Sequence, residues 1–237
     1  GELLRVLDDH PGFVLKLSFS KDGTQLVSSS ADETITGSAD DITDRTVRIW
    51  DVETGENTVI IDPQSGFVRD VEFSPNGDVV ASTSWDSANG GTARIYDAET
   101  GEEIRRFFAH RDVLTNLAFT PDGTQLITAS WDKSIRFWDL DKGVELRSFV
   151  DFGDRVIDIE FTPDGEYLLI GMGNVGDNSI TTNEDSPVDP SVWLWDLENR
   201  TQSQVYSGHT DWTWTTDISP DGTLAASGSG PLNLPEN

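Results

Sequence analysis

The chain has 237 residues, of which 35% are hydrophobic and 9% aromatic, so it is long enough to bury a core. Its formal net charge is −27, from 43 acidic and 16 basic residues. Such an acidic surface repels phosphate backbones, so nucleic acid is not expected as a partner. The sequence has no Cys, which excludes disulfides and thiol nucleophiles. No apolar run approaches the ~20 residues of a membrane-spanning helix, and no membrane partner is expected.

The first elements expected along the chain are short strands separated by tight turns. A run at about 2–7 is expected to be a strand. One four-residue turn then recurs five times, as SKDG (20–23), SPNG (74–77), TPDG (120–123), TPDG (162–165) and SPDG (219–222). Each copy ends in Gly, the residue that most readily takes a positive φ. Each copy is preceded by an alternating run, such as VLTNLAF, and followed by another, such as TQLITAS. This period-two pattern predicts antiparallel hairpins.

A second unit follows the first four hairpins and supplies two more strands. It reads TVRIWDVETGE (46–56), TARIYDAETGE (92–102), SIRFWDLDKGV (134–144) and SVWLWDLENRT (191–201). The shortest repeat runs from the turn at 120 to the turn at 162. Four short strands in a repeat of ~40–45 residues are typical of a β-propeller blade. The sequence therefore predicts an all-β fold built from four-stranded antiparallel blades.

The motifs resemble those of the WD-repeat family of β-propellers, with WD at Trp50–Asp51, Trp138–Asp139 and Trp195–Asp196 and GH at Gly208–His209. The resemblance covers essentially the whole chain as one domain, 1–237. The repeat units are about 3–51, 52–97, 98–139, 140–196 and an incomplete 197–237. Counting strands gives nineteen, with four full blades and two strands at about 212–229. A propeller closes to remove its sheet edges, so we expect a segment of a longer propeller. The alternative is a five-bladed ring whose last blade lacks its third strand.

The resemblance implies a structural hydrogen-bond network of His, Ser, Asp and Trp in a blade. In the third unit these positions are His110, Ser130, Asp132 and Trp138. Across the five units the His position holds His10, Gln64, His110, Phe152 and His209. The first unit keeps Trp50, while the second has Tyr96 at the Trp position. We therefore expect the network to be intact in the third unit, partial elsewhere and absent from the fourth.

Three insertions lengthen the same type of loop, between the second and third strands of a blade. They lie at 31–44, 85–92 and 173–190. Loops of one type project from one face of a propeller, and insertions on one face often mark a binding face. The alternative is drift in length, which surface loops tolerate at little thermodynamic cost.

Aromatic side chains are expected to open towards the same face. The resemblance implies that their positions line a partner-binding surface, with two acids of the third insertion at its rim. The candidates are Phe13, Phe67, Trp85, Trp131 and Trp212, with Glu184 and Asp185 at the rim. The alternative for the aromatics is packing against the blade rim.

These observations favour a non-enzymatic platform for a protein partner, and the net charge suits a basic one. The three His occupy the structural position, which leaves no spare imidazole for a base or a metal cage, and no catalytic residue, cofactor or metal is expected. The regular repeats resemble those of bacterial WD-repeat proteins. The alternative function is a ligand-binding or hydrolytic propeller that uses channel carboxylates and Ca²⁺. Carboxylates that converge on the axis would favour that alternative.

Overall fold

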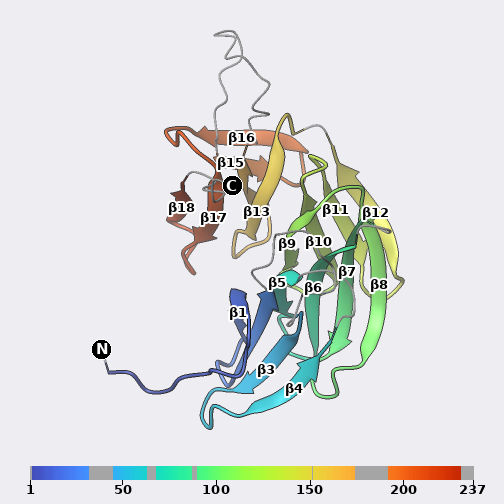
Figure 1. The fold of residues 1–237 in the computed structure, drawn as a ribbon. Coiled ribbons are helices and arrows are strands. Elements are labelled where there is room, and N and C mark those ends of the chain that lie inside the picture. The colour runs from blue at the N-terminus through green and yellow to red at the C-terminus, as the bar shows by residue number, and fades with distance from the viewer. Residues whose placement is uncertain are drawn as a thin grey trace, which may run out of the picture.

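The computed structural model describes residues 2–31, 45–62, 68–86, 90–150, 152–173 and 192–230 (Figure 1). In these ranges the chain forms strands and turns, and no helix that could cross a membrane is found in them. The strands assemble into four sheets of four antiparallel strands and one sheet of two.

The sheets follow one another along the chain, and each keeps its strands in sequence order. The first contains β1 (Phe13–Phe19), β2 (Gln25–Ala31), β3 (Val47–Asp51) and β4 (Asn57–Ile61). The second contains β5 (Val68–Phe73), β6 (Val79–Asp86), β7 (Gly90–Asp97) and β8 (Glu103–His110). The third contains β9 (Leu114–Phe119), β10 (Gln125–Ser130), β11 (Ile135–Asp139) and β12 (Val144–Phe149). The fourth contains β13 (Arg155–Phe161), β14 (Tyr167–Gly173), β15 (Val192–Asp196) and β16 (Thr201–Tyr206), and the two-stranded sheet contains β17 (Thr213–Ile218) and β18 (Ala225–Ser229).

The recurring turns form as the sequence predicts, and their side chains show why. In the third sheet, Asp122 accepts hydrogen bonds from the hydroxyl of Thr120 at 2.6 Å and from the backbone N–H of Thr124 at 3.0 Å. Gly123 between them has a φ of 70°, which a Gly adopts without strain. The turn after β11 is held in the same way, since Asp139 accepts from the backbone N–H of Lys142 at 2.8 Å. These turns all lie at one edge of the sheets, which we call the turn edge.

The opposite edge is the one at which β1, β5, β9, β13 and β17 begin and β2, β6, β10, β14 and β18 end. We call it the loop edge. The joins between second and third strands lie here, and they include the three insertions identified in the sequence. The two edges therefore differ in kind, with short repeated turns on one and variable joins on the other.

Apolar side chains fill the space between neighbouring sheets. Between the third and fourth sheets, Ile127 and Phe137 pack in one cluster with Val156 and Ile159. Equivalent clusters join the first sheet to the second and the second to the third. Face-to-face packing of this kind is expected because each sheet is apolar on both faces.

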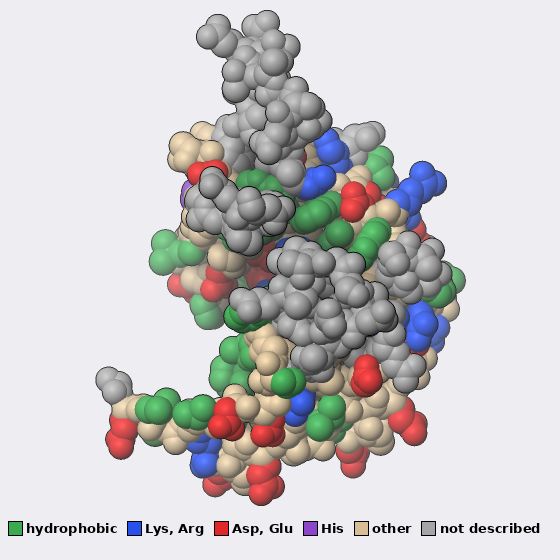
Figure 2. Space-filling model, viewed as in Figure 1, with side chains coloured by type: hydrophobic (Ala, Val, Ile, Leu, Met, Phe, Trp, Pro, Cys, Tyr) green, Lys and Arg blue, Asp and Glu red, His purple; other side chains and the backbone are tan. Residues whose placement is uncertain are grey.

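The five sheets form an open arc, with β1 at one end and β17–β18 at the other (Figure 1). The space-filling view shows the same opening (Figure 2). Leu17 on β1 is 54% exposed, whereas the equivalent Val71, Leu117 and Ile159 of the next three sheets are at most 3% exposed. The outer face of the first sheet thus has no sheet against it within the described residues.

The prediction of four full blades followed by two strands is confirmed. The prediction of a further strand at about 2–7 is wrong. Glu2–His10 has no strand assignment. A strand needs a neighbour with free backbone groups, and this segment lies beside the turn after β3 instead. There the guanidinium of Arg5 donates to the carbonyl oxygen of Thr54 at 3.1 Å. The described residues therefore contain eighteen strands rather than nineteen.

Candidate functional site

The three predicted insertions lie only partly within the described residues. Residues 32–44 and 174–191 fall outside them, and with them Glu184 and Asp185. The insertion at 85–92 is largely described, and it lengthens a hairpin: β6 and β7 each have eight residues. Gly90, with a φ of 78°, lies where an added Cβ would come within 2.5 Å of the carbonyl oxygen of His110. Gly90 therefore allows β7 to run closely past the end of β8.

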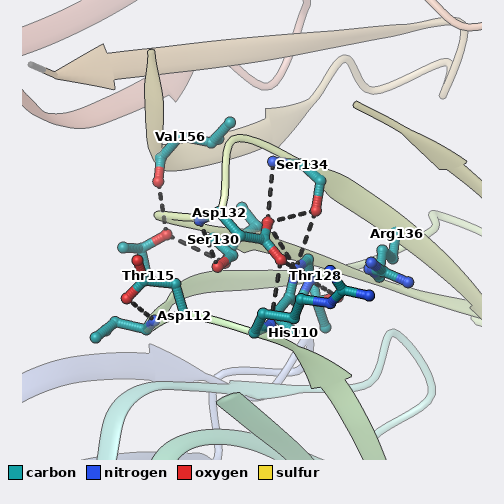
Figure 3. Close-up of polar contacts among 12 residues, drawn as sticks. His110, Asp112, Thr115, Thr128, Ser130, Asp132, Ser134, Arg136 and Val156 are labelled. Atoms are coloured by element: carbon teal, nitrogen blue, oxygen red, sulfur yellow. Dashed lines mark hydrogen bonds and ion pairs between the residues drawn. The ribbon is translucent and has the colours of Figure 1, made fainter. Parts of the chain in front are cut away.

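The third sheet contains a buried hydrogen-bond network near the loop edge (Figure 3). The carboxylate oxygens of Asp132 lie 3.1 and 3.0 Å from Nδ1 of His110, so Nδ1 donates and Nε2 is left as an acceptor. The hydroxyl of Thr128 donates to Nε2 at 2.8 Å, and its oxygen accepts from Nε1 of Trp138 at 2.9 Å. Burial alone would raise the pKa of Asp132, but hydrogen bonds from His110 and Ser134 lower it to about 2.

The bridging hydroxyl is that of Thr128, which corrects the assignment of Ser130 to this role. The pairing of β10 with β9 skips Thr115, so the bulge lies in β9, and Thr128 and Ser130 stay on one face of β10 with Ser130 nearer the loop edge. Ser130 instead accepts a hydrogen bond from the backbone N–H of Asp132 at 3.0 Å. Thr128 is also closer to Trp138, because Leu126 two residues earlier is the register partner of Trp138.

The other sheets show parts of the same network. In the first, Ser28 lies 2.6 Å from His10 Nε2 and accepts from Trp50 Nε1 at 2.7 Å. In the two-stranded sheet, His209 Nε2 lies 2.7 Å from the hydroxyl of Ser227. Gln64 of the second unit lies outside the described residues.

The fourth sheet replaces the network by apolar contact. The ring centroid of Phe152 lies 5.2 Å from that of Trp195. Ile170 occupies the position of Thr128, because Leu168 pairs with Trp195 as Leu126 pairs with Trp138. In the described part of the chain, Nε1 of Trp195 has no hydrogen-bond acceptor. This sheet therefore depends on packing where the first, third and two-stranded sheets use hydrogen bonds.

Aromatic and basic side chains from four sheets gather at the loop edge. The rings of Trp131 and Trp212 meet edge to face with centroids 6.1 Å apart, and Trp212 stacks on Trp214 at 5.0 Å. The guanidinium carbons of Arg155 and Arg69 lie 4.5 and 5.6 Å from the centroid of Trp131. Trp212 is buried, while the other four side chains are half-buried. We call these five residues the Trp131 cluster.

The two other predicted aromatics within the described residues, Trp85 and Phe13, form no ring contact with this cluster. Trp85 is half-buried near the end of β6. Phe13 is half exposed at the start of β1, at the open end of the arc. Phe67 lies outside the described residues. Trp131 and Trp212 are thus the two predicted aromatics whose rings meet.

Carboxylates on the first strands form a second polar group, deeper between the sheets. Asp70 accepts from the backbone N–H of Leu117 in the next sheet at 2.7 Å, and Lys16 Nζ lies 3.6 Å from its other oxygen. Asp158 likewise accepts from the backbone N–H of Thr216 and, at 2.6 Å, from the side-chain amide of Asn116. These carboxylates satisfy N–H groups on strand edges that have no neighbouring strand to pair with.

The position of Asp158, Glu160 and Glu72 raises the pKa values of these three carboxyls. Burial raises the pKa of Asp158 to about 6, although Lys16 opposes the shift. Burial, with the charges of Asp158 and Asp217, raises the pKa of Glu160 to about 7, even though its side chain keeps contact with solvent. Burial, with the charge of Asp70, also raises the pKa of Glu72 well above its usual range. No set of three or more His, Asp or Glu with the geometry of a metal site occurs among the described residues.

A cavity of about 450 Å³ lies at the turn edge, between the third and fourth sheets. Its lining includes Phe137, Phe161 and Arg147, whose guanidinium carbon lies 4.2 Å from the centroid of Phe137. The turn edge therefore contains a cavity at this point, whereas the sequence predicted a binding surface only at the loop edge.

The repeated four-stranded sheets, the WD turns and the His–Thr–Trp network together define a WD-repeat propeller architecture. A family model for the WD domain, G-beta repeat, matches residues 1–51, 56–97, 101–139 and 200–230. These matches cover more than half of the chain, which belongs to the WD40 repeat family. A comparison with curated proteins gives no match. WD40 repeats generally mediate protein–protein interaction. The unmatched stretch between 139 and 200 contains most of the fourth sheet, in which Phe152 and Ile170 replace the polar network.

Sequence reasoning missed Arg69, Arg155 and the first-strand acids. Arg69 and Arg155 stand near the start of first strands, in FVRD and DRVID, at the level of the predicted aromatics. Basic residues are scarce in this chain, so two at equivalent ends of two strands were a usable signal. A repeated position could have revealed the first-strand acids. In three first strands, an Asp or Asn stands three residues before the last Phe, at Asp70, Asn116 and Asp158.

Proposed function

We propose that the chain is a non-enzymatic platform that holds a protein partner against its loop edge. The observation that carries this proposal is the Trp131 cluster, in which three Trp and two Arg from four sheets meet at that edge. Trp and Arg are enriched among the residues that dominate binding energies. The sheets hold them in place, so binding orders few additional side chains.

The charge of the chain favours a partner that carries basic residues around its contact surface. A net charge of −27 attracts such a partner over a distance and accelerates encounter. We propose that Glu184 and Asp185 contribute to this attraction from the rim, while the Trp131 cluster supplies the close contact. Phe13, Phe67 and Trp85 remain further candidates for that contact.

The hydrolytic or Ca²⁺-binding alternative receives less support from the first-strand acids. Asp70 and Asp158 do face the inside of the arc, as that alternative requires. However, each accepts a backbone N–H of the next sheet, and Asp70 also faces the ammonium group of Lys16. A carboxylate engaged in this way has few lone pairs left for a cation. We assign these acids to the joining of sheets.

Site-specific photo-crosslinking tests the proposed face. A photoreactive phenylalanine analogue replaces Arg111, an exposed residue whose backbone N–H donates to Asp132 at the loop edge. The matched control replaces Lys142, which is exposed at the turn edge. Both changes remove one positive charge. Crosslinks to one discrete partner from position 111 and none from position 142 support the platform, while the reverse pattern places the partner at the other edge.

A further inference from the structure

Two arginines of the Trp131 cluster form no close ion pair within the described residues, although the chain has an excess of acids. Neither Arg69 nor Arg155 forms a side-chain ion pair or hydrogen bond in the described part of the chain. Their contacts there are with the ring of Trp131. With 43 acidic and 16 basic residues, an unpaired guanidinium is the less expected state. Two of them beside one ring therefore call for an explanation.

The acids next to them in sequence form hydrogen bonds with other groups, although burial raises the pKa of Asp154 and the charge of Arg155 acts against this rise. Asp70 adjoins Arg69 in sequence, but its oxygens receive the N–H of Leu117 and face Lys16. Asp154 adjoins Arg155, and its side chain accepts the backbone N–H of Arg155 at 2.8 Å rather than a guanidinium N–H. Burial also lowers the pKa of Arg69, which shows that its guanidinium has given up part of its hydration. Both guanidiniums retain N–H groups that an external oxygen could accept.

Trp131 supplies an independent sign of a missing acceptor. Its Nε1 is buried, and no hydrogen-bond acceptor for it is present in the described residues. A buried N–H without an acceptor destabilises a protein unless a ligand or a water molecule accepts its hydrogen bond. Two guanidiniums from the neighbouring sheets thus lie over the Trp131 ring, and neither they nor its indole N–H has a side-chain acceptor within the described residues.

We propose that the Trp131 cluster binds the carboxylate of an Asp or Glu side chain in the partner. This inference rests on the proposed function and names the chemistry of its central contact. Guanidinium groups match the planar geometry of a carboxylate, and the indole N–H adds a third donor. A phosphorylated side chain would offer the same oxygens with nearly two negative charges. The acidic chain repels that dianion more than a carboxylate, so the carboxylate is the ligand we favour.

A short peptide can test this chemistry before any partner is known. The probe has a central glutamate between glycines and a lysine at each end, so that its net charge does not oppose binding. The control peptides carry glutamine or phosphoserine at the centre. The readout is the indole ¹H–¹⁵N resonance of Trp131, assigned by its loss in Trp131→Phe. We expect this resonance to shift on titration, with the glutamate peptide binding at least about tenfold more tightly than the glutamine peptide.

Variants locate the effect and separate it from general electrostatics. Arg155→Gln and Arg69→Gln should each weaken binding of the glutamate peptide by at least about fivefold. Arg147→Gln is the matched control, because Arg147 also lies over an aromatic ring but at the turn edge; it should leave binding unchanged. The other indole resonances report whether each variant keeps its fold.

Several results would overturn the inference. Equal affinity for the glutamate and glutamine peptides would show that no carboxylate is recognised. Tighter binding of the phosphoserine peptide would replace the carboxylate by a phosphate. Equal loss in Arg147→Gln would reduce the effect to net charge. If no peptide shifts the Trp131 resonance while crosslinks still form at position 111, the carboxylate inference fails and the platform stands; if crosslinks also fail there, both are wrong.

Discussion

The hydroxyl of Thr128 satisfies the hydrogen-bonding nitrogens of two buried rings at once. It donates to Nε2 of His110 and accepts from Nε1 of Trp138, so both rings depend on one oxygen. The His and Trp of this network could be predicted from the sequence, because the WD ending and the spacing of the repeats fix them. The hydroxyl could not, because Thr128 and Ser130 lie on the same face of β10 and only their distance along the strand from the partner of Trp138 separates their roles. The positions of Arg69 and Arg155 could be noticed in the sequence, but their contact with Trp131 could not be predicted, because it joins different sheets.

The first prediction concerns this hydroxyl. Thr128→Val keeps the shape of the side chain but leaves Trp138 Nε1 without an acceptor and His110 Nε2 without a donor. The free energy of unfolding should fall by about 1–3 kcal/mol, the usual effect of unsatisfied buried polar groups. Ser130→Ala removes one acceptor for a backbone N–H and should have less than half of that effect. Urea denaturation measures both; a larger loss for Ser130→Ala would return the bridging role to Ser130.

At the scale of the element, the first strands of the third, fourth and two-stranded sheets each have a free edge, at which a backbone N–H donates to a side chain of the preceding sheet. Asp70 and Asp158 serve this purpose for the third sheet and for β17–β18. Most strands were predictable because alternation and Gly turns bound them. The strand expected at 2–7 was not formed, since the pattern of a single strand does not show whether a neighbour is present. The carboxylate contacts between sheets were likewise invisible in any one repeat.

The second prediction follows for the two-stranded sheet. Two strands alone are marginally stable, and Asp158 holds β17 through the backbone N–H and hydroxyl of Thr216. Asp158→Ala should therefore accelerate amide hydrogen exchange of Thr216 and its neighbours in β17–β18 by roughly tenfold or more at neutral pH. Exchange in β10 and β11 should change little. Asp122→Ala, in an exposed turn, serves as the control; uniform acceleration in both variants would contradict a local role for Asp158.

At the scale of the whole molecule, an acidic chain has placed several carboxylates between its sheets. The raised pKa values of Asp158, Glu160 and Glu72 mean that the fold disfavours their charged forms. The net charge was evident from the sequence. The placement of these three acids on the inside of the arc was not evident, because it depends on how the first strands of different sheets converge.

The third prediction is a stability that rises on mild acidification. For an acid whose folded pKa is raised, the folded state binds the proton more tightly than the unfolded state. Stability is therefore lost as pH rises from the unfolded pKa near 4 through the folded pKa, which is about 6 for Asp158. The midpoint of thermal unfolding should increase as pH falls from 7.5 to about 5. Below pH 4 it should fall again as Asp132, whose pKa is about 2, begins to lose its charge.

Asp158→Asn separates the buried carboxyl from the self-repulsion of a highly charged chain. The variant keeps one acceptor oxygen and has no proton to gain, so its midpoint should change less between pH 7.5 and 5 than that of the wild type. A wild-type midpoint that falls steadily over this range would contradict the account of the first-strand acids.

The central claim is that a protein partner binds the loop edge through the Trp131 cluster. The most direct measurement is the dissociation constant of the partner identified by crosslinking, for Trp131→Ala and for Arg147→Ala at the turn edge. The account predicts that Trp131→Ala weakens binding by about 2 kcal/mol or more without unfolding the chain, and that Arg147→Ala leaves it unchanged. Wild-type affinity in a folded Trp131→Ala, together with a loss in Arg147→Ala, would contradict it and place the partner at the cavity of the turn edge.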